Sequence, residues 1–224
     1  MSADLQSRIE KRLGCAVIQG YGLTETSPVT HIDFADHRKK PGSIGPPLPD
    51  VEQRVVDMDD GTTDIAANEL GELLMRGPNV MRGYYDQPAA TANAIDADGW
   101  FHSGDLVKID EDGYVYVLDR KKELIKYSGF QVPPAELEGI LLEHRAVADA
   151  AVIGKEDAEH GEVPKAFVVR KQGTKVDAKE LMAYVADQVA TFKQIREVEF
   201  VESIPKNPSG KLLRRLLVDQ ERAK

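Results

Sequence analysis

The sequence is poor in the features that mark secreted, membrane-spanning and metal-binding proteins. Only one of its 224 residues, Cys15, is a cysteine, so the chain has neither an internal disulfide nor a cysteine-rich metal site. Charged residues interrupt its longest apolar runs, which excludes a transmembrane helix. The first residues contain no apolar stretch like that of a signal peptide. We therefore expect a cytoplasmic protein without a membrane span.

Positive charge is also scarce. The formal net charge is −9, from 38 Asp and Glu against 29 Lys and Arg, which disfavours nucleic-acid binding because that requires a positive field. The acidic surplus is most simply a solvated surface that keeps the protein soluble. An anionic ligand would need a local basic cluster. Two such clusters are present: Arg120–Lys122 with Lys126, and Lys206 through Lys211 to Arg214 and Arg215.

The first part of the chain, before Asp119, is rich in glycine, proline and short strand-like runs. A helix is expected at Ala3–Leu13 and another after Pro88, since proline suits a first helical turn. The expected strands are Val51–Met58, Glu72–Met75, Trp100–Ile109 and Tyr114–Leu118, the last two joined by a hairpin turn.

From Asp119 onward, helices and strands alternate. A helix opened by Pro134 places four residues on one apolar face: Leu137, Ile140, Leu141 and His144. A second helix runs from a capping box at Asp177 and Glu180 to about Ala190. Strands are expected at Ala148–Ile153, Ala166–Val169 and Val198–Val201, and a short basic helix at Leu212–Val218. The pattern predicts an α+β fold, with a β-rich first domain and a small α+β second domain.

A glycine-rich segment, Gln19-Gly20-Tyr21-Gly22-Leu23-Thr24-Glu25-Thr26, is the first candidate site. Glycines let a backbone approach a ligand closely. An aromatic ring at Tyr21 can stack on a base, threonine hydroxyls can meet phosphate, and Glu25 can bind Mg²⁺. Taken alone, a segment of this kind is more often an ordinary turn, so both interpretations stay open.

Asp105, which follows Gly104 in an otherwise apolar strand, is the second candidate. An aspartate there suits a bidentate contact to ribose hydroxyls, but it also suits the capping of a turn. His102 has no Asp or Ser partner at a recognisable spacing, so we interpret it as a structural histidine rather than part of a catalytic triad.

Two basic segments complete the candidates. Asp119–Gln131 combines a basic cluster with the domain boundary, and is either a solvated charged linker or a hinge. Pro205–Lys211 places Lys211 on a Pro/Gly loop, where a mobile cation can neutralise developing phosphate charge. It is not a Walker P-loop, because Pro205 stands where a glycine is required and Leu212 follows the lysine. The alternative is an ordinary surface lysine.

Taken in order, these four segments resemble the adenylate-forming enzymes: acyl-CoA synthetases, luciferases and the adenylation domains of peptide synthetases. The chain looks most like the fatty-acyl and coumarate CoA ligases. Three further segments share the resemblance, which covers essentially the whole chain: Pro41–Gly45, Gly71-Glu72-Leu73 and Gly83-Tyr84-Tyr85. It implies the β-rich end of a large adenylation domain, residues 1–121. A small α+β C-terminal domain, residues 122–224, would follow, with a hinge near Lys122.

The resemblance also implies roles for residues of the first domain. Four consecutive residues would form the adenine-side segment: Gln19, Gly20, Tyr21 and Gly22. Thr24 would contact the α-phosphate, and Glu25 would bind Mg²⁺. Asp105 and Arg120 would hold the ribose.

In the second domain, Lys122 matches the hinge residue of the family. Lys126 and Gln131 match residues that face the adenylate once the small domain has turned. Gly129 matches the turn along which the CoA arm passes, and Lys211 matches the lysine of the adenylation step.

The reaction implied by the resemblance has two halves and makes the protein an acid–thiol ligase. ATP and a carboxylic acid give an acyl-adenylate and pyrophosphate, and the thiol of CoA then displaces AMP. The expected cofactors are ATP/AMP, Mg²⁺ and CoA, and the expected substrate is a fatty acid or, second, an aryl acid. One charged loop cannot serve both steps at once, so the small domain is expected to rotate about its hinge.

The sequence departs from the family pattern in two places. Ser128 stands where coumarate ligases and luciferases often carry a lysine, so no charge contact to CoA is expected there. The 224 residues also lack the Ser/Thr/Gly-rich loop, ending in Pro-Lys-Gly, that cradles the β- and γ-phosphates in the family. We therefore expect a truncated ligase with little activity alone. The alternative is a non-catalytic nucleotide-binding remnant or half-enzyme, which self-associates or needs a partner chain.

Overall fold

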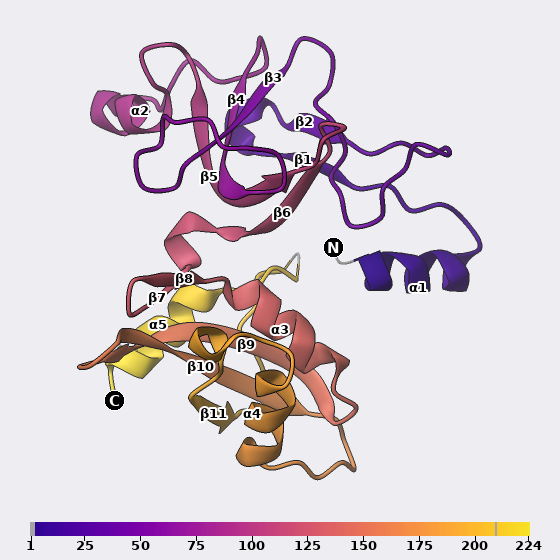
Figure 1. Ribbon diagram of the computed structural model, residues 1–224, viewed down its shortest axis with the longest axis vertical. Helices are drawn as coiled ribbons and strands as arrows, with labels where there is room; N and C mark the ends of the chain where they lie inside the picture. The colour runs from indigo at the N-terminus through magenta and orange to yellow at the C-terminus, as the bar shows by residue number, and fades with distance from the viewer. Residues whose placement is uncertain (1–2, 209) are drawn as a thin grey trace. The chain divides into compact units, whose positions relative to one another are not determined.

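The computed structural model describes residues 3–208 and 210–224, and the chain folds as two compact units, residues 1–121 and 122–224. Figure 1 shows the elements of both units. Each unit combines helices with mainly antiparallel strands, so the predicted α+β class is confirmed.

The first unit is built on a four-stranded antiparallel sheet in which each strand pairs with the next along the chain. Its strands are β3 (Glu52–Val56), β4 (Leu70–Arg76), β5 (Phe101–Ile109) and β6 (Val115–Arg120). A two-stranded ribbon, β1 (Gly20–Gly22) and β2 (Val29–Ile32), joins the unit, together with helices α1 (Ala3–Leu13) and α2 (Pro88–Ala94).

Both faces of this sheet carry buried side chains, since successive strand residues point to opposite sides and successive residues of β4 are buried. On β4, Leu73 and Met75 join one buried cluster with Phe101 and Val115. Leu74 between them packs with Trp100 on the other face. Two residues of the candidate nucleotide site belong to this sheet: Asp105 lies in the middle of β5, and its partner Arg120 is the last residue of β6.

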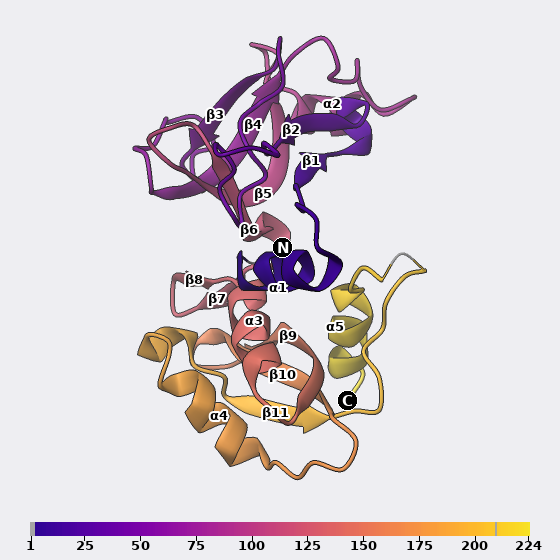
Figure 2. The same ribbon diagram turned by 90° about the vertical axis from the view of Figure 1, so that its right-hand side faces the viewer.

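The second unit is a sheet covered by helices on both faces (Figure 2). Its central strand β10 (Gly161–Arg170) pairs antiparallel with β9 (Val147–Asp157) and parallel with β11 (Glu197–Phe200). Side chains of α3 (Pro134–Glu143) and α4 (Ala178–Ala186) form a cluster with β9 residues Ala150 and Val152. Their neighbours Ala151 and Ile153 pack instead with α5 (Arg214–Arg222).

The linker interpretation of Asp119–Gln131 is wrong from Ile125 onward. The chain there forms a hairpin of two short strands, β7 (Ile125–Tyr127) and β8 (Phe130–Val132), turned by Ser128 and Gly129. Both turn residues have positive φ, 46° and 85°, as a two-residue type I′ turn requires. Ile125 and Val132 are buried, so the hairpin is anchored in the core although its charged residues had suggested a linker.

Other element boundaries also differ from those expected. Helix α4 ends at Ala186 rather than near Ala190, because the chain leaves the helix to pack Val189 and Phe192 against the core. Helix α5 starts at Arg214 instead of Leu212, after the Lys211 loop closes. The hairpin of β9 and β10 is longer than expected, since polar residues extend its ladder as far as Asp157 and Gly161. In the described part of the chain, no helix combines the length and hydropathy needed to cross a bilayer.

Candidate functional site

Three side chains that the sequence analysis assigned to the nucleoside meet in the first unit. Tyr21 of β1 donates its hydroxyl to Asp105 Oδ2 at 2.5 Å, and Arg120 Nε lies 3.1 Å from Asp105 Oδ1. Asp105 is only 3% exposed, whereas the Arg120 side chain is 45% exposed. Asp105 and Arg120 are direct partners across β5 and β6. Residues far apart in the sequence therefore form one polar cluster at the sheet.

The Tyr21 hydroxyl is held as a donor. Burial raises the pKa of the Tyr21 phenol, and the charge of Asp105 and its hydrogen bond raise that pKa further. A phenol that stays protonated keeps the Asp105 carboxylate oriented. The half-buried Tyr21 ring also packs edge-on against His31.

The backbone around Asp105 is fixed by the strand beside it. Gly104 has a φ of +69° and donates its N–H to Glu72 Oε1 at 3.1 Å. Ser103 Oγ accepts from the Asp105 N–H and donates to the Leu73 carbonyl. A left-handed residue in the middle of a strand favours glycine, and here it turns Asp105 toward Tyr21.

The glycine-rich segment is a tight turn as well as a candidate site. A side chain at Gly22 would place its Cβ 1.7 Å from the Pro28 carbonyl oxygen, so only glycine fits. Thr26 Oγ closes the turn by accepting from the Leu23 N–H at 2.9 Å and donating to the Pro28 carbonyl at 2.7 Å. At Gly20 a Cβ would make an ordinary 3.6 Å contact. The local fold therefore explains Gly22, and the ligand roles of Gly20 and Gly22 stay predictions.

The Gln19 side chain has a partner that the sequence did not reveal. Its Nε2 donates to Gln6 Oε1 at 3.0 Å, and Gln6, fully buried on α1, donates to the Val17 carbonyl and accepts from the Gly42 N–H. A glutamine in an amphipathic helix is normally exposed, so nothing in the sequence marked Gln6. The adenine contact assigned to Gln19 remains a prediction.

Thr24 and Glu25 lie on a 3₁₀ turn, Thr24–Thr26, directly after β1. Thr24 is exposed, and Glu25 Oε1 accepts a hydrogen bond from the Tyr84 hydroxyl at 2.9 Å. That bond, with burial and the charge of Glu25, raises the pKa of Tyr84. Tyr84 belongs to one of the segments that share the family resemblance, but no role had been assigned to it.

A single carboxylate suits the Mg²⁺ expected at Glu25. Magnesium in nucleotide sites is commonly held by one or two carboxylates and the substrate phosphates. Among the described residues, no group of three His, Cys, Asp or Glu side chains could enclose a metal ion. Glu25 therefore fits an ion that is bound together with the nucleotide.

Candidate residues of the second unit lie on two exposed features. Lys126 and Gln131 are direct partners across β7 and β8, so their side chains share one face of the hairpin. Lys211 lies on a loop closed by the Asn207 N–H, which donates to the Lys211 carbonyl at 2.9 Å. The Lys211 N–H in turn donates to Asn207 Oδ1 at 2.8 Å. Ser209 of this loop lies outside the described residues.

The turn of the β7–β8 hairpin is supported by His160, which the sequence analysis missed. Ser128 Oγ lies 2.9 Å from His160 Nδ1, and the Ser128 N–H donates to the His160 carbonyl at 2.8 Å. The imidazole also stacks on Tyr127, with ring centroids 4.6 Å apart. A contact across 32 positions leaves no signal in a single sequence.

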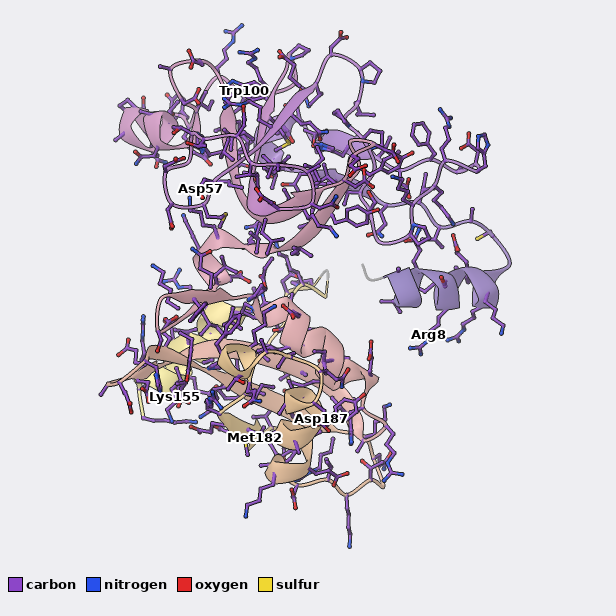
Figure 3. The ribbon with its side chains drawn as sticks, in the orientation of Figure 1. Arg8, Asp57, Trp100, Lys155, Met182 and Asp187 are labelled. Atoms are coloured by element: carbon purple, nitrogen blue, oxygen red, sulfur yellow. The ribbon has the colours of Figure 1, made fainter. Side chains whose placement is uncertain are left out.

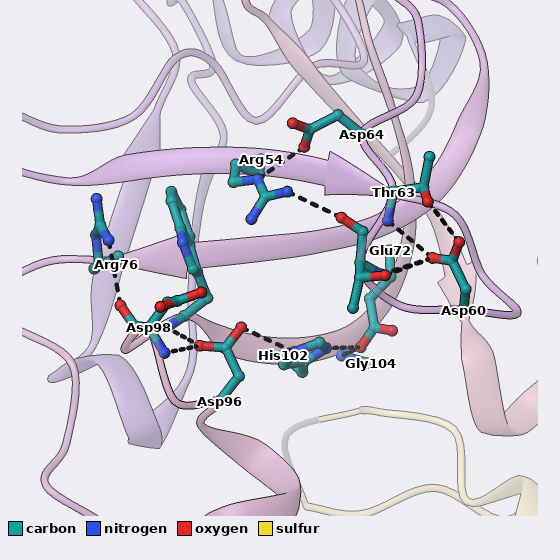
Figure 4. Close-up of polar contacts among 12 residues, drawn as sticks. Arg54, Asp60, Thr63, Asp64, Glu72, Arg76, Asp96, Asp98, His102 and Gly104 are labelled. Carbon is teal, nitrogen blue, oxygen red and sulfur yellow. Dashed lines mark hydrogen bonds and ion pairs between the residues drawn. The ribbon is translucent and has the colours of Figure 1, made fainter.

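Figure 4 shows the surroundings of His102. Its two ring nitrogens each lie 3.8 Å from a carboxylate oxygen, one of Glu72 and one of Asp96. Nearby, Trp100 lies under the guanidinium groups of Arg54 and Arg76. No Asp partner for His102 was recognised from the sequence, whereas the fold brings Asp96 and Glu72 beside its ring. Its interpretation as a structural histidine stays a prediction.

Comparison with known proteins assigns the chain to a family. Residues 1–85 match the model of the AMP-binding enzyme, and residues 136–211 match the model of the AMP-binding enzyme C-terminal domain. The 4-coumarate–CoA ligase-like 4 of Oryza sativa subsp. japonica is 48% identical over 210 residues, which are 93% of this chain.

The chain belongs to the AMP-binding enzyme family.

Other relatives agree with this assignment. The peroxisomal OPC-8:0-CoA ligase 1 of Arabidopsis thaliana is 47% identical over 93% of the chain. These two curated ligases are matched over only 38% of their own length, so the chain spans about two fifths of the relatives that it matches.

Among solved structures, ATP-bound MatB from Rhodopseudomonas palustris is similar to this AMP-binding chain. It shares 36% identity with a TM-score of 0.92, over 98% of the chain and 43% of MatB. Apo MatB gives a TM-score of 0.70 at the same identity and coverage. The two MatB structures therefore differ from each other over the matched region.

Proposed function

We propose that the chain carries part of an acid–thiol ligase that makes an acyl-CoA from a carboxylic acid, ATP and CoA. The cluster of Tyr21, Asp105 and Arg120 carries this proposal. It offers a fixed carboxylate for ribose hydroxyls and an aromatic ring for a base, within one unit of an AMP-binding family member. The coumarate and OPC-8:0 ligases among the relatives support CoA as the acceptor of the acyl group.

In the first half-reaction, a carboxylate oxygen of the acid attacks the α-phosphorus of ATP. The bond between the α-phosphorus and the bridging oxygen breaks, and pyrophosphate leaves. Asp105 and Arg120 hold the ribose, Thr24 donates to an α-phosphate oxygen, and Lys211 brings a positive charge to the phosphates. Mg²⁺ bound with Glu25 would neutralise part of the phosphate charge.

In the second half-reaction, the thiol sulfur of CoA attacks the acyl carbon. The bond between that carbon and the phosphate oxygen breaks, AMP leaves with the electron pair, and the thiol proton is released to water. Lys126 and Gln131 share one face of the hairpin, and both would contact the phosphate of the adenylate once the second unit has turned. The turn at Ser128 and Gly129 is open to the CoA arm, since a Cβ built on Gly129 meets no atom within 4 Å.

Carboxylate-dependent ATP–pyrophosphate exchange tests this function, with a panel of fatty and aryl-propenoic acids. The 224 residues contain no phosphate loop ending in Pro-Lys-Gly, so we expect exchange near background from the chain alone. The matched pair is Lys211→Ala against Lys179→Ala, which removes another exposed lysine of the second unit. Robust exchange that only Lys211→Ala abolishes would establish the adenylation half-reaction within this chain and contradict the expected inactivity. Exchange that survives Lys211→Ala would contradict the role of Lys211.

A second candidate function is that of a nucleotide-binding half that works with a partner chain or a second copy. Exposed apolar side chains in the first unit favour it, and they lie on α1, on β2 and between them: Leu5, Leu13, Ile18, Val29 and Ile32. Apolar surface of this kind marks interaction sites. Sedimentation velocity of the purified chain is expected to show self-association. A monomer at all concentrations that binds no AMP would contradict this second function.

A further inference from the structure

The boundary between the two units falls between Lys121 and Lys122, within a single 3₁₀ turn, Lys121–Glu123. The first and last residues of this turn each make an ion pair inside their own unit. Lys122, the middle residue, is exposed, and its side chain makes no ion pair with any residue that the structure describes. The exposed Lys122 therefore lies between two residues whose side chains are each bound to their own unit.

On the side of the first unit, Lys121 Nζ lies 2.9 Å from Glu72 Oε2. The Glu72 side chain is only 5% exposed and comes from β4, in the interior of the four-stranded sheet. Its other oxygen accepts the Gly104 N–H at 3.1 Å, which fixes the carboxylate. Only the carboxylate of this pair is buried, since the Lys121 side chain is 39% exposed. Opening the contact would leave the buried Glu72 carboxylate without this cation, which disfavours opening.

On the side of the second unit, Glu123 pairs with Arg214, the first residue of α5. The same guanidinium binds Glu138 of α3 through two bonds, Nε to Oε1 at 3.0 Å and Nη2 to Oε2 at 2.6 Å. Glu138 is buried, and its Oε1 also accepts from the Val152 N–H at 2.9 Å. A two-bond arginine–carboxylate contact is both strong and directional.

The core of the second unit begins directly after this contact, since Leu124 and Ile125 are both buried. In the first unit, β6 runs up to Arg120, which pairs with Asp105. The residue directly before Lys122 is therefore bound to the first unit, and the residue directly after it is bound to the second.

We infer that Glu72 and Arg214 are positioning residues that confine motion between the two units to the backbone angles of Lys122. Glu72 holds Lys121 to the first sheet, and Arg214 holds Glu123 to α3 and α5. The pivot is then one residue wide, because turning either neighbour of Lys122 would break the ion pair that joins its side chain to a mostly buried partner in its own unit.

The consequence for turnover rests on the proposed function. Arg214 lies three residues after Lys211, so the contact that secures the pivot also secures the end of the Lys211 loop. A narrow pivot lets the second unit turn as a rigid body, so that Lys211 and then Lys126 are presented in defined positions. A loose linker would present both lysines over a broad range of positions.

Limited trypsin digestion tests the inference without any ligand. Arg120, Lys121 and Lys122 form three adjacent cleavage sites, and cleavage there requires local unfolding of the chain around them. We expect the wild-type chain to resist cleavage at these sites, and Arg214→Gln to be cut there about tenfold faster. Arg215→Gln removes an equally charged but exposed neighbour and should behave like wild type. On the other side, Glu72→Gln should increase cleavage and Glu69→Gln should not.

A spin-label distance measurement provides the second readout. The single native cysteine, Cys15, is exposed and labels the first unit. An Asp187→Cys substitution, at the exposed end of α4 (Figure 3), labels the second. Arg214→Gln should broaden the distance distribution, and Arg215→Gln should leave its width unchanged. Arg214→Lys should give an intermediate width, because lysine keeps the charge but loses the two-bond contact to Glu138.

Three results would overturn the inference: wild-type cleavage as fast as in Arg214→Gln, equal cleavage in Glu72→Gln and Glu69→Gln, or equally broad distributions in all variants. Circular dichroism identifies a variant that fails to fold. If Arg214→Gln unfolds, Glu72→Gln and Arg214→Lys decide the question. Neither readout depends on nucleotide binding or turnover, so failure of the proposed function and failure of this inference are separable.

Discussion

The two units place their candidate chemistry in opposite settings. In the first unit, Asp105 is buried, Tyr21 and Glu25 are half-buried, and each of the three has a hydrogen-bonded partner. In the second, Lys126 and Lys211 are exposed, and the buried charges belong to the scaffold. A site that is rigid before ligand arrives suits recognition of one nucleoside. Exposed cations on a separate unit suit groups that are brought to the phosphates in turn.

The largest effect is expected from the scaffold of the second unit. Lys165 is 1% exposed, and its Nζ lies within 2.6–2.9 Å of three carboxylates: Glu197, Glu199 and Glu221. Replacing it by alanine removes the buried cation that these acids share and leaves them only the more exposed Lys155 and Lys224. The expected cost is about 3 kcal/mol of unfolding free energy, at the lower end for the loss of a buried ionic partner. Chemical denaturation of Lys165→Ala measures the loss, with Lys175→Ala as the exposed control. Equal stability of the two variants would show that the cluster is not a scaffold element.

The same cluster predicts how stability depends on pH. Burial raises the pKa of Glu221, but its bonds to Lys165 and Lys224 outweigh burial and lower it to about 2 from the usual 4.5. A depressed carboxyl pKa stabilises the fold above the unfolded-state value, and that contribution is lost as pH falls toward 2. Thermal melts between pH 6 and pH 2, a range that spans the unfolded and the folded pKa of Glu221, should show this loss. Glu221→Gln should lose stability at pH 6 and depend less on pH, and an unchanged pH profile would contradict the assignment.

A smaller effect is expected when the first site loses one hydroxyl. Tyr21→Phe removes the donor that orients Asp105, leaving a buried carboxylate with one fewer partner. The expected cost is about 1–3 kcal/mol of stability in the first unit, with weaker AMP binding. Tyr114→Phe, which removes a hydroxyl bonded to the Arg38 carbonyl in the same unit, is the control for stability without a change in AMP affinity. Calorimetric titration of AMP into both variants separates a loss of binding from a loss of stability. Equal AMP affinity in both variants would exclude a binding role for the Tyr21 hydroxyl.

The smallest effect is expected at the hairpin turn. Ser128→Ala removes an exposed contact to His160 but keeps the backbone hydrogen bond between the same residues. Its cost in unfolding free energy should stay below about 1 kcal/mol. Gly129→Ala at the adjacent turn position should cost more, because its φ of +85° strains any side chain. A larger loss for Ser128→Ala than for Gly129→Ala would show that the His160 contact, rather than turn geometry, holds the hairpin.

Periodicity in the sequence predicted the elements whose apolar side chains recur at a regular helical or strand spacing. Pro134 and the apolar face of α3 identified that helix, and alternation with a turn at Gly113 identified the pairing of β5 and β6. The hairpin of β7 and β8 was missed because Lys126 and the basic residues before it conceal two short strands. Local pattern cannot show that Ile125 and Val132 reach a distant core.

Family resemblance proposed the site residues, but not what holds them. Tyr21 and Asp105 are 84 positions apart, and only the folded chain brings their oxygen atoms together. Gln6 and Lys165 look like exposed residues of a helix and a strand, yet both are buried with polar partners. Long-range partners of this kind depend on tertiary packing, which one sequence does not encode in any short pattern.

Calorimetric titration of AMP into the 224-residue chain tests the central claim most directly, namely that the first unit alone holds the nucleoside. We predict that Asp105→Asn binds AMP at least about tenfold more weakly than wild type. Asp59→Asn, on an exposed turn of the same unit, and Lys211→Ala, in the second unit, should bind AMP like wild type. Equal affinity for Asp105→Asn and wild type, or no AMP binding by the folded wild-type chain, would contradict the claim.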